Sequence, residues 1–384
     1  MKPIPYGTQH ITDEDIAAVT EALKSPLLTQ GPKLAEFERA FADYVGARYA
    51  VAVSNGTAAL HLSALPAGLG PGDRAITTPI TFAASANCIR YCGAEPVFAD
   101  IDPQTYLLDA NRVETLLQQA EPGTYKALIP VDLAGYPVDA ERFRRLADRY
   151  GLRIIEDACH APGAWFTDSS GKRQRTGNGA YADMTVFSFH PVKHIACGEG
   201  GMVTTDSEEL YEKLLLYRTH GITKNPEQLE RHPGGWYYEM QELGYNYRLT
   251  EFQAALGLSQ LKRADAGLAR RQEIARVYDE GLKDCPGLTL PSRAKDIYHA
   301  FHLYVIQCDN RKGLYDHLHA SGIFAQVHYI PVHLQPYYRS FGWKPGDLPV
   351  AEGYYERCLS LPMYPTLTDE EQRYVIDRVK AFYR

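Results

Sequence analysis

Between about residues 36 and 260 the chain alternates short apolar runs with longer stretches of helical periodicity. Parallel strands buried on both faces appear as nearly continuous apolar runs joined by helical crossovers. The pattern therefore predicts an α/β fold in which helices cover a large, mostly parallel, seven-stranded sheet. The expected strands are YAVAVSN at 49–55, RAITTPI at 74–80, EPVFADI at 95–101, KALIPVDL at 126–133, LRIIEDA at 152–158, MTVFSF at 184–189 and GGMVTTD at 200–206.

After about residue 265 the pattern of apolar and polar residues changes. A long polar helix is expected at 270–284, and the runs that follow it read as strand, helix, strand and final helix. These runs are HAFHLYVIQC, RKGLYDHLHASG, FAQVHYIPV and TDEEQRYVIDRVKAF. A chain of 384 residues exceeds what one hydrophobic core usually supports. We therefore expect two domains, residues 1–262 with the large sheet and residues 263–384 as a small C-terminal α+β domain.

Two helix starts carry capping boxes. Thr12 and Asp15 open an early amphipathic helix, and Thr368 and Glu371 open the final one. The early helix places three apolar residues on one stripe, namely Ile16, Val19 and Leu23.

Charge and composition exclude several classes of protein. The net charge of −7 leaves no global basic field to hold nucleic acid or an anionic membrane, so a phosphate group must be bound locally. No segment approaches about 18 uninterrupted apolar residues, and the first ten residues lack the apolar core of a signal peptide. Seven scattered cysteines without a CxxC pair suit reduced thiols. We expect a cytoplasmic protein.

The stretch SFHPVKHIACGEGG, residues 188–201, carries the densest set of reactive groups. His190, His194 and Cys197 have the spacing of metal ligands on one helix face. Pro191 argues against that helix, because it removes a backbone donor and biases the preceding residue toward an extended conformation. The other interpretation makes Lys193 the reactive group, an amine presented between two strands and able to bond to a carbonyl cofactor.

Two further motifs decide between these interpretations. In SNGTAAL an expected strand meets Gly56 and Thr57 and then becomes a helix, which is the geometry that offers N–H groups to a phosphate. In LRIIEDACHA a strand ends on Glu156 and Asp157, where an open α/β sheet has its ligand crevice. Alternation along the strand lets only one of these two acids face the crevice. A helix N-cap role is the alternative for Asp157.

Together these motifs indicate pyridoxal phosphate. A phosphate-binding turn, an acid for the pyridinium nitrogen and a Schiff-base lysine are what this cofactor requires of a protein, and they occur here in that order. No metal is expected.

The sequence resembles the DegT/DnrJ/EryC1/StrS family of nucleotide-sugar aminotransferases. Members of this family have the type I aminotransferase fold of pyridoxal-phosphate-dependent transferases. The resemblance covers essentially the whole chain. It rests on six blocks in family order: LTQGP at 28–32, SNGTAAL at 54–60, TTPITFAASAN at 77–87, EDACHAPGA at 156–164, SFHPVKHIACGEGGM at 188–202 and GYNYRLTEFQAALGLSQL at 244–261.

The resemblance implies roles for individual residues. Lys193 would bond to the cofactor and carry the proton between cofactor and sugar carbons, and Asp157 would hold the pyridinium nitrogen. Phe82 would stack on the ring, with plain core packing as its alternative. His160, which stands where many members carry glutamine, would contact the ring hydroxyl or stack. The phosphate would be bound by Gly56, Thr57, Ala58, Ser188 and, from the neighbouring subunit of a homodimer with shared sites, Asn246.

The resemblance also implies a substrate. The segments YGTQHITDEDI, FSFHPVK and WYYEMQELGYNYR are similar to enzymes of pseudaminic acid biosynthesis, which aminate C4 of a UDP-linked 4-keto-6-deoxy-N-acetylhexosamine with L-glutamate and pass through pyridoxamine phosphate. Related enzymes use dTDP- or GDP-linked keto sugars. Candidate sugar contacts are Tyr6, Thr29, His328, Tyr329 and His333, and for the last three a layer of side chains between domains is the alternative.

Two alternative functions come from other classes of protein. A dehydratase of the same fold usually replaces the catalytic lysine with histidine, and here GEGG, four residues after His194, aligns Lys193 with the lysine position. A non-catalytic cofactor-binding regulator is expected to lack Lys193 or Asp157, and both are present.

Overall fold

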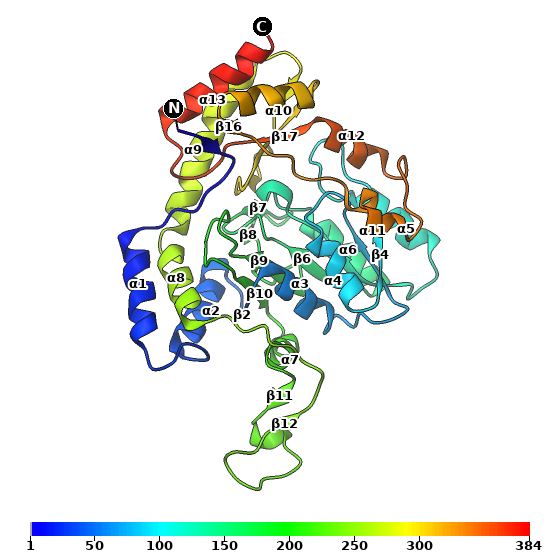
Figure 1. The fold of residues 1–384 in the computed structure, drawn as a ribbon. Coiled ribbons are helices and arrows are strands. Elements are labelled where there is room, and N and C mark those ends of the chain that lie inside the picture. Colours follow the sequence, from blue (N-terminus) through cyan, green and yellow to red (C-terminus); the bar gives the residue numbers. More distant parts are fainter. Residues whose placement is uncertain (1) are drawn as a thin grey trace.

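The computed structural model describes residues 2–384, and all seven expected strands lie in one seven-stranded sheet. Its order is β2-β10-β9-β6-β5-β3-β4, and within this sheet β10 runs antiparallel to both neighbours while the remaining pairs are parallel (Figure 1). The large, mostly parallel sheet is confirmed. The strands are β2 Tyr49–Val53, β3 Arg74–Thr77, β4 Glu95–Phe98, β5 Tyr125–Ile129, β6 Arg153–Asp157, β9 Met184–Ser188 and β10 Gly201–Thr205.

Both faces of this sheet are buried. On β2, Val51 and Val53 pack into a cluster with residues of α3 and α4, whereas Ala50 and Ala52 pack with α2 on the opposite face. This division follows from the two-residue period of a strand. The helices around the sheet are α2 Pro32–Val45, α3 Gly56–Ala64, α4 Ala84–Tyr91, α5 Ala110–Gln119, α6 Ala140–Tyr150, α7 Glu208–Arg218 and α8 Glu251–Leu261.

Phe41 of α2 is a centre of the core on one face. Its side chain is fully buried, and its ring centroid lies 4.9 Å from that of Phe187 on β9 and 5.4 Å from that of Phe189. Replacing Phe41 with alanine is expected to lower the free energy of unfolding by about 3–5 kcal/mol, because the exchange removes the ring and leaves a cavity. Chemical denaturation measures the loss, with the exposed Tyr337→Ala as the matched control. Equal losses in the two variants would contradict this packing.

The early helix α1, Asp13–Lys24, has the expected capping box at Thr12 and lies beside α8 (Figure 1). Its inward face carries Asp15, which accepts hydrogen bonds from Arg263 at 2.8 Å and Gln260 at 2.9 Å. Burial acts to raise the pKa of Asp15, but the hydrogen bonds and charge of Arg263, together with hydrogen bonds from Ser259 and the backbone of Thr12, outweigh it and lower the pKa to about 2. The apolar stripe faces outward instead, with Ile16 57% and Leu23 54% exposed in the single chain.

The C-terminal part is a helix and strand layer with its own core. The three-stranded antiparallel sheet β13-β15-β17 packs with α9, α10 and α13, and the final helix has its predicted capping box at Thr368. The N-terminal strand β1, Ile4–Pro5, pairs with β16 of this part.

The division into domains at residue 262 stays a prediction. The helices are α9 Ala264–Leu282, α10 Arg311–Ala320, α11 Pro336–Arg339, α12 Pro349–Arg357 and α13 Asp369–Phe382, and the strands are β13 Leu288–Thr289, β14 Ile297–Tyr298, β15 Tyr304–Cys308, β16 Ile323–Phe324 and β17 Cys358–Leu361.

Two expected strands of this part are shorter than predicted. The run HAFHLYVIQC forms β15 only from Tyr304 onward, and of the run FAQVHYIPV only its first residue, Phe324, is in a strand, as the second residue of β16. In the second run, Gln326 still pairs with Ser360, but Val332 donates to Pro79 O at 2.8 Å. The segment thus leaves the small sheet and crosses to the large one, which brings its middle to the site described below.

An arm extends from the large sheet beyond α7 (Figure 1). It carries the antiparallel pair of β11, Ile222–Thr223, and β12, Glu239–Met240, and includes the tyrosine-rich segment near residue 237. A three-stranded sheet of order β14-β7-β8 joins β7 Trp165–Thr167 and β8 Arg173–Arg175 to β14 of the C-terminal part.

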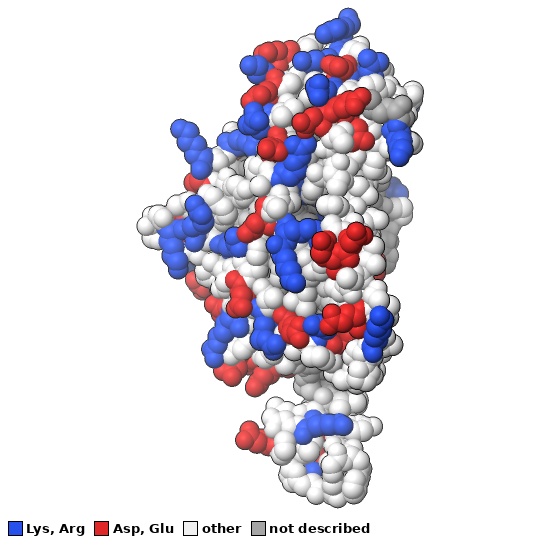
Figure 2. All heavy atoms as spheres, turned by 90° about the vertical axis from the view of Figure 1, so that its left-hand side faces the viewer, with Lys and Arg blue, Asp and Glu red and all other residues white. Residues whose placement is uncertain are grey.

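The surface carries both signs of charge. On the face that includes α1, Lys and Arg alternate with Asp and Glu and no broad patch of one sign is seen, whereas few charges mark the arm (Figure 2). Within residues 2–384, no helix has the length and apolarity needed to cross a membrane.

Candidate active site

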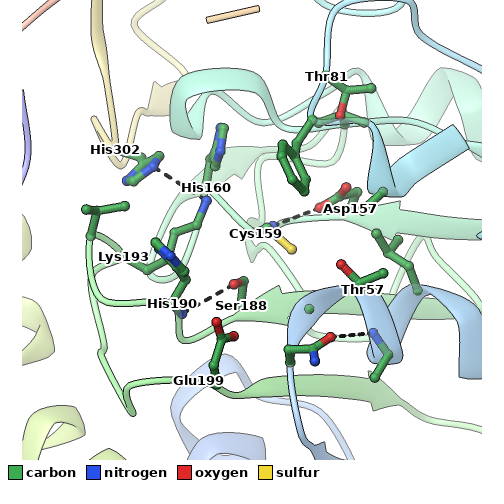
Figure 3. Close-up of a pocket in the computed structure, with 18 of the residues that line it drawn as sticks. Thr57, Thr81, Asp157, Cys159, His160, Ser188, His190, Lys193, Glu199 and His302 are labelled. Carbon is green, nitrogen blue, oxygen red and sulfur yellow. Dashed lines mark hydrogen bonds between the residues drawn. The ribbon is translucent and has the colours of Figure 1, made fainter. Parts of the chain in front are cut away.

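The site lies where three strands of the large sheet end. β2, β6 and β9 run in the same direction, so their carboxyl ends meet at one edge of the sheet. Asn55 follows β2, Asp157 ends β6 and Ser188 ends β9. The connection from β9 to β10 adds Lys193, and all of these side chains border one cavity of about 720 Å³ (Figure 3).

The phosphate corner is the first turn of α3. Asn55 caps this helix, and its side chain accepts a hydrogen bond from Ala58 N at 2.8 Å. The first backbone bond within the helix runs from Ala59 N to Asn55 O, so the N–H groups of Gly56 and Thr57 precede the helical ladder and are placed for an anion. A Cβ atom at Gly56 would lie 3.0 Å from Cβ of Ser188, which explains the glycine.

Asp157 is the acid that faces the cavity. Its Oδ2 accepts from Ser85 Oγ at 2.6 Å and its Oδ1 from Cys159 N at 3.1 Å, which fixes the carboxylate and leaves further lone pairs for a ligand. No helix begins directly after it, so the N-cap alternative is wrong. Glu156 points to the other side of the strand, where it accepts from Thr185 at 2.9 Å, as strand alternation predicts. Burial and the charge of Asp157 raise the pKa of Glu156 to about 7.

Lys193 reaches the cavity from a loop without helical structure, as the proline predicted. Removal from water lowers the pKa of its amine to about 8, and the nearby Arg271 acts in the same direction. Cys159 and Asp157 oppose this shift. An amine with a pKa near neutrality is a usable base, whereas an ordinary lysine is fully protonated.

Aromatic side chains border the space above Asp157. Phe82 is 62% exposed and lines the cavity, so the alternative of plain core packing is wrong for it. His160 is buried, accepts from Ala134 N at 3.2 Å through Nδ1, and meets the hydroxyl of Tyr329 at 3.2 Å through Nε2. Burial, followed by the charge of Lys193, lowers the pKa of His160 well below its usual value, so the imidazole is neutral.

The structure brings most of the predicted site residues together. The cavity is lined by the predicted residues Tyr6, Gly56, Thr57, Ala58, Phe82, Asp157, His160, Ser188, Lys193, His328 and Tyr329. It is not lined by Thr29, Asn246 or His333. His333 is fully buried, contacts Glu352 at 3.1 Å and packs near Phe98 of β4, with ring centroids 6.3 Å apart, so it lies between the C-terminal part and the large sheet. Thr29 and Asn246 are exposed in the single chain.

Sequence reasoning missed several residues of the cavity wall. The polar ones are Asn55, His61, Thr81, Tyr91, Cys159, His190, Glu199, Tyr247 and His302. His302 is the most consequential, because its Nε2 lies 3.5 Å from Nζ of Lys193. The sequence does offer one indication of His302: it is a histidine inside the apolar run HAFHLYVIQC, and packing in a strand favours apolar residues at such positions.

The comparisons with known proteins agree with this geometry. Residues 9–380 match the DegT/DnrJ/EryC1/StrS aminotransferase family. The spore coat polysaccharide biosynthesis protein SpsC of Bacillus subtilis (strain 168) is 42% identical over 388 residues, which cover 98% of this chain and 96% of SpsC.

Solved structures give the same result. Helicobacter pylori PseC, an aminotransferase involved in the biosynthesis of pseudoaminic acid, superposes with a TM-score of 0.90 at 33% identity and covers 100% of this chain and 99% of its own. Spr1654 of Streptococcus pneumoniae, solved in a PLP-form and a PMP-form, has a TM-score of 0.90 at 30% identity and covers 99% of this chain and 98% of its own.

Proposed function

Because the chain belongs to the DegT/DnrJ/EryC1/StrS aminotransferase family, we propose that it transfers the amino group of L-glutamate to C4 of a nucleotide-linked 4-keto-6-deoxy sugar. The protein is a pyridoxal-phosphate-dependent sugar aminotransferase with the fold of that class. The observation that carries the proposal is one cavity holding a desolvated lysine, a fixed carboxylate and an open helix N-terminus.

The residues present fit pyridoxal phosphate. The N-terminus of α3, with Ser188 beside it, is a cradle for the phosphate. Asp157 is held by two donors and retains acceptor capacity toward the cavity, which suits a protonated ring nitrogen. Phe82 offers an exposed aromatic face of the size a pyridine ring covers. Lys193 would supply the amine that bonds to the cofactor's carbonyl carbon.

When bound, pyridoxal phosphate supplies a ring that withdraws electrons from the carbon that loses a proton. The protein's part is positional and electrostatic. Asp157 would hold the ring nitrogen protonated by its negative charge. Lys193 would take the Cα proton of glutamate as a neutral amine and would return a proton at the sugar carbon in the second half-reaction. His160 and Tyr329 would keep that region closed to water by their mutual contact.

The proposed acceptor is UDP-2-acetamido-2,6-dideoxy-β-L-arabino-hex-4-ulose, the keto sugar of the pseudaminic acid pathway. The likeness to PseC along the full length of both chains supports it. Tyr6, His328 and Tyr329 border the cavity beyond the lysine, and their aromatic rings and hydroxyls suit a sugar. The ring centroids of Tyr6 and His328 lie 5.2 Å apart, and His328 is fixed by Ser360 at 2.8 Å.

We also propose a homodimer with shared sites. Several large apolar side chains of the arm are exposed in the single chain, namely Trp236, Tyr238, Met240 and Leu243. Exposed apolar surface of this kind marks an interface. In the dimer Asn246, which is exposed near the base of the arm, would reach the phosphate of the neighbouring site.

The acceptor is tested with a panel of UDP-, dTDP- and GDP-linked 4-keto sugars and L-glutamate as donor. We expect kcat/KM for the UDP-linked sugar to exceed that for the other nucleotides by at least about ten-fold, since losing or misplacing a polar contact weakens transition-state binding. A 3-keto sugar serves as the control for the position of attack. Preference for a dTDP- or GDP-linked sugar would overturn the substrate while leaving the aminotransferase reaction in place.

A further inference from the structure

His302 is the side chain that contacts the amine of Lys193. Its Nε2 lies 3.5 Å from Nζ, and among residues 2–384 no other side-chain hydrogen bond of that amine is present. Figure 3 shows the imidazole directed at the end of the lysine, on the side away from Asp157. The distance is at the long end for a hydrogen bond, and such contacts in sites without substrate tighten when the reacting complex forms.

The segment that carries His302 is held in a strained conformation. Phe301 has a φ of 46°, a region that bulky residues avoid. The carbonyls of Phe301 and His302 both accept from Nη1 of Arg271, at 3.0 and 3.3 Å, and Ala300 N donates to Gly135 O at 2.8 Å. A strained backbone conformation persists only where the surrounding structure enforces it, and such conformations cluster at functional sites. Here the strain fixes where the next residue, His302, points.

The polar atoms of His302 serve little else. The side chain is only 4% exposed, and its Nδ1 has no hydrogen-bond partner among residues 2–384. A buried polar nitrogen without a partner destabilises the fold, so an apolar ring at this position would be at least as stable. The contact of Nε2 with Lys193 is the polar interaction that His302 makes in return.

The charges around the pair keep the imidazole neutral. Burial, followed by the charge of Lys193, lowers the pKa of His302 well below its usual value. The other titratable groups that face the pair come from the end of β6, from the lysine loop, from α9 and from the segment after β16, and they are Asp157, Cys159, His160, His194, Arg271 and His328. Because burial and the positive charges of Lys193 and Arg271 disfavour a protonated imidazole, Nε2 of His302 can offer a lone pair to the amine.

We propose that His302 is the positioning residue of Lys193: its neutral Nε2 accepts one N–H of the amine and thereby directs the amine's lone pair into the cavity. The inference rests on the proposed function, in which Lys193 moves the proton. A neutral amine has two N–H groups and one lone pair, so anchoring one N–H restricts rotation about the Cε–Nζ bond. When the amine takes up a proton, the same acceptor stabilises the ammonium, and no group has to move.

The test compares His302→Phe, which keeps a planar ring without an acceptor, with His302→Gln, which restores one. Half-buried His317, whose Nε2 contacts Arg378 O, provides the matched control His317→Phe. Two properties are measured. The first is the pH dependence of acetylation of Lys193 by acetic anhydride in the cofactor-free protein, read by peptide mass spectrometry. The second is kcat and KM of the reconstituted enzyme, with Tm recorded for each variant.

In the wild type the midpoint of labelling is expected near pH 8. In His302→Phe the midpoint moves to lower pH, because the ammonium loses its acceptor while the site stays dry. Tm is unchanged or higher, and kcat falls about a hundred-fold at nearly constant KM, as expected for a misdirected catalytic group. His302→Gln recovers part of both effects, and His317→Phe shows neither.

A midpoint that rises toward the ordinary lysine value of 10.5, with a lower Tm, would show that the ring only excludes water, and would overturn the inference. An unchanged midpoint with unchanged kcat would overturn it as well. Failure of the proposed function would give a different result, because the labelling experiment needs neither cofactor nor substrate. In that case Lys193 would still titrate as expected, but the wild-type protein would not transfer an amino group.

Discussion

Replacing Lys193 with alanine is expected to lower transamination by at least about 10⁴-fold, because the exchange removes both the covalent anchor of the cofactor and the base that moves the proton. The cavity should otherwise persist, since the lysine lies on a loop at its edge rather than in the core. Steady-state assays with L-glutamate and a keto sugar measure the loss. Covalent attachment is measured separately, by borohydride reduction of the holoenzyme followed by peptide mass spectrometry.

The matched control for this variant is Lys213→Ala on the surface of α7, where the lysine pairs with Glu209. It should retain wild-type turnover and cofactor attachment. If Lys193→Ala kept a covalently attached cofactor, another amine would be the reactive group and the assignment of the loop would be wrong.

Replacing Asp157 with asparagine is expected to lower kcat by about 10²–10³-fold, because the amide keeps the shape of the carboxylate but loses the charge that holds the ring nitrogen protonated. The exchange should leave the hydrogen bond from Ser85 in place, since an amide oxygen also accepts. Steady-state kinetics measure the change in kcat, and cofactor titration measures the change in affinity.

The neighbouring acid supplies the control for Asp157. Glu156→Gln is the same exchange one residue earlier, on the face that contacts Thr185 rather than the cavity. It should change kcat by no more than a few-fold, about the scatter of conservative substitutions outside a site. Equal losses in Asp157→Asn and Glu156→Gln would show that the charge of this strand end, and not a specific contact, governs the rate.

The sequence predicted the parts of the fold that are set by local pattern. All seven strands of the large sheet were recognisable, because parallel strands buried on both faces must be apolar throughout. Lys193 and Asp157 were recognisable for a related reason: strand ends at one edge of such a sheet meet. The capping boxes at Thr12 and Thr368 marked their helices.

What the sequence could not predict depends on contacts distant along the chain. His302 follows Lys193 by 109 residues, and it reaches the lysine because Phe301 adopts a strained conformation that Arg271 supports. The run at 324–332 reads as a strand, yet most of it crosses to the large sheet. The predicted role of Asn246 requires a second copy of the chain, and Thr29 does not line the cavity of the single chain, so both roles stay predictions.

The most direct test of the account is the visible absorption of the purified protein with added pyridoxal phosphate, before and after L-glutamate, with Lys193→Ala measured in parallel. The wild-type protein is expected to acquire the colour of a lysine-bound cofactor and to lose it when glutamate is added, whereas Lys193→Ala should never acquire that colour. Wild-type colour that glutamate leaves unchanged would contradict the glutamate-dependent reaction.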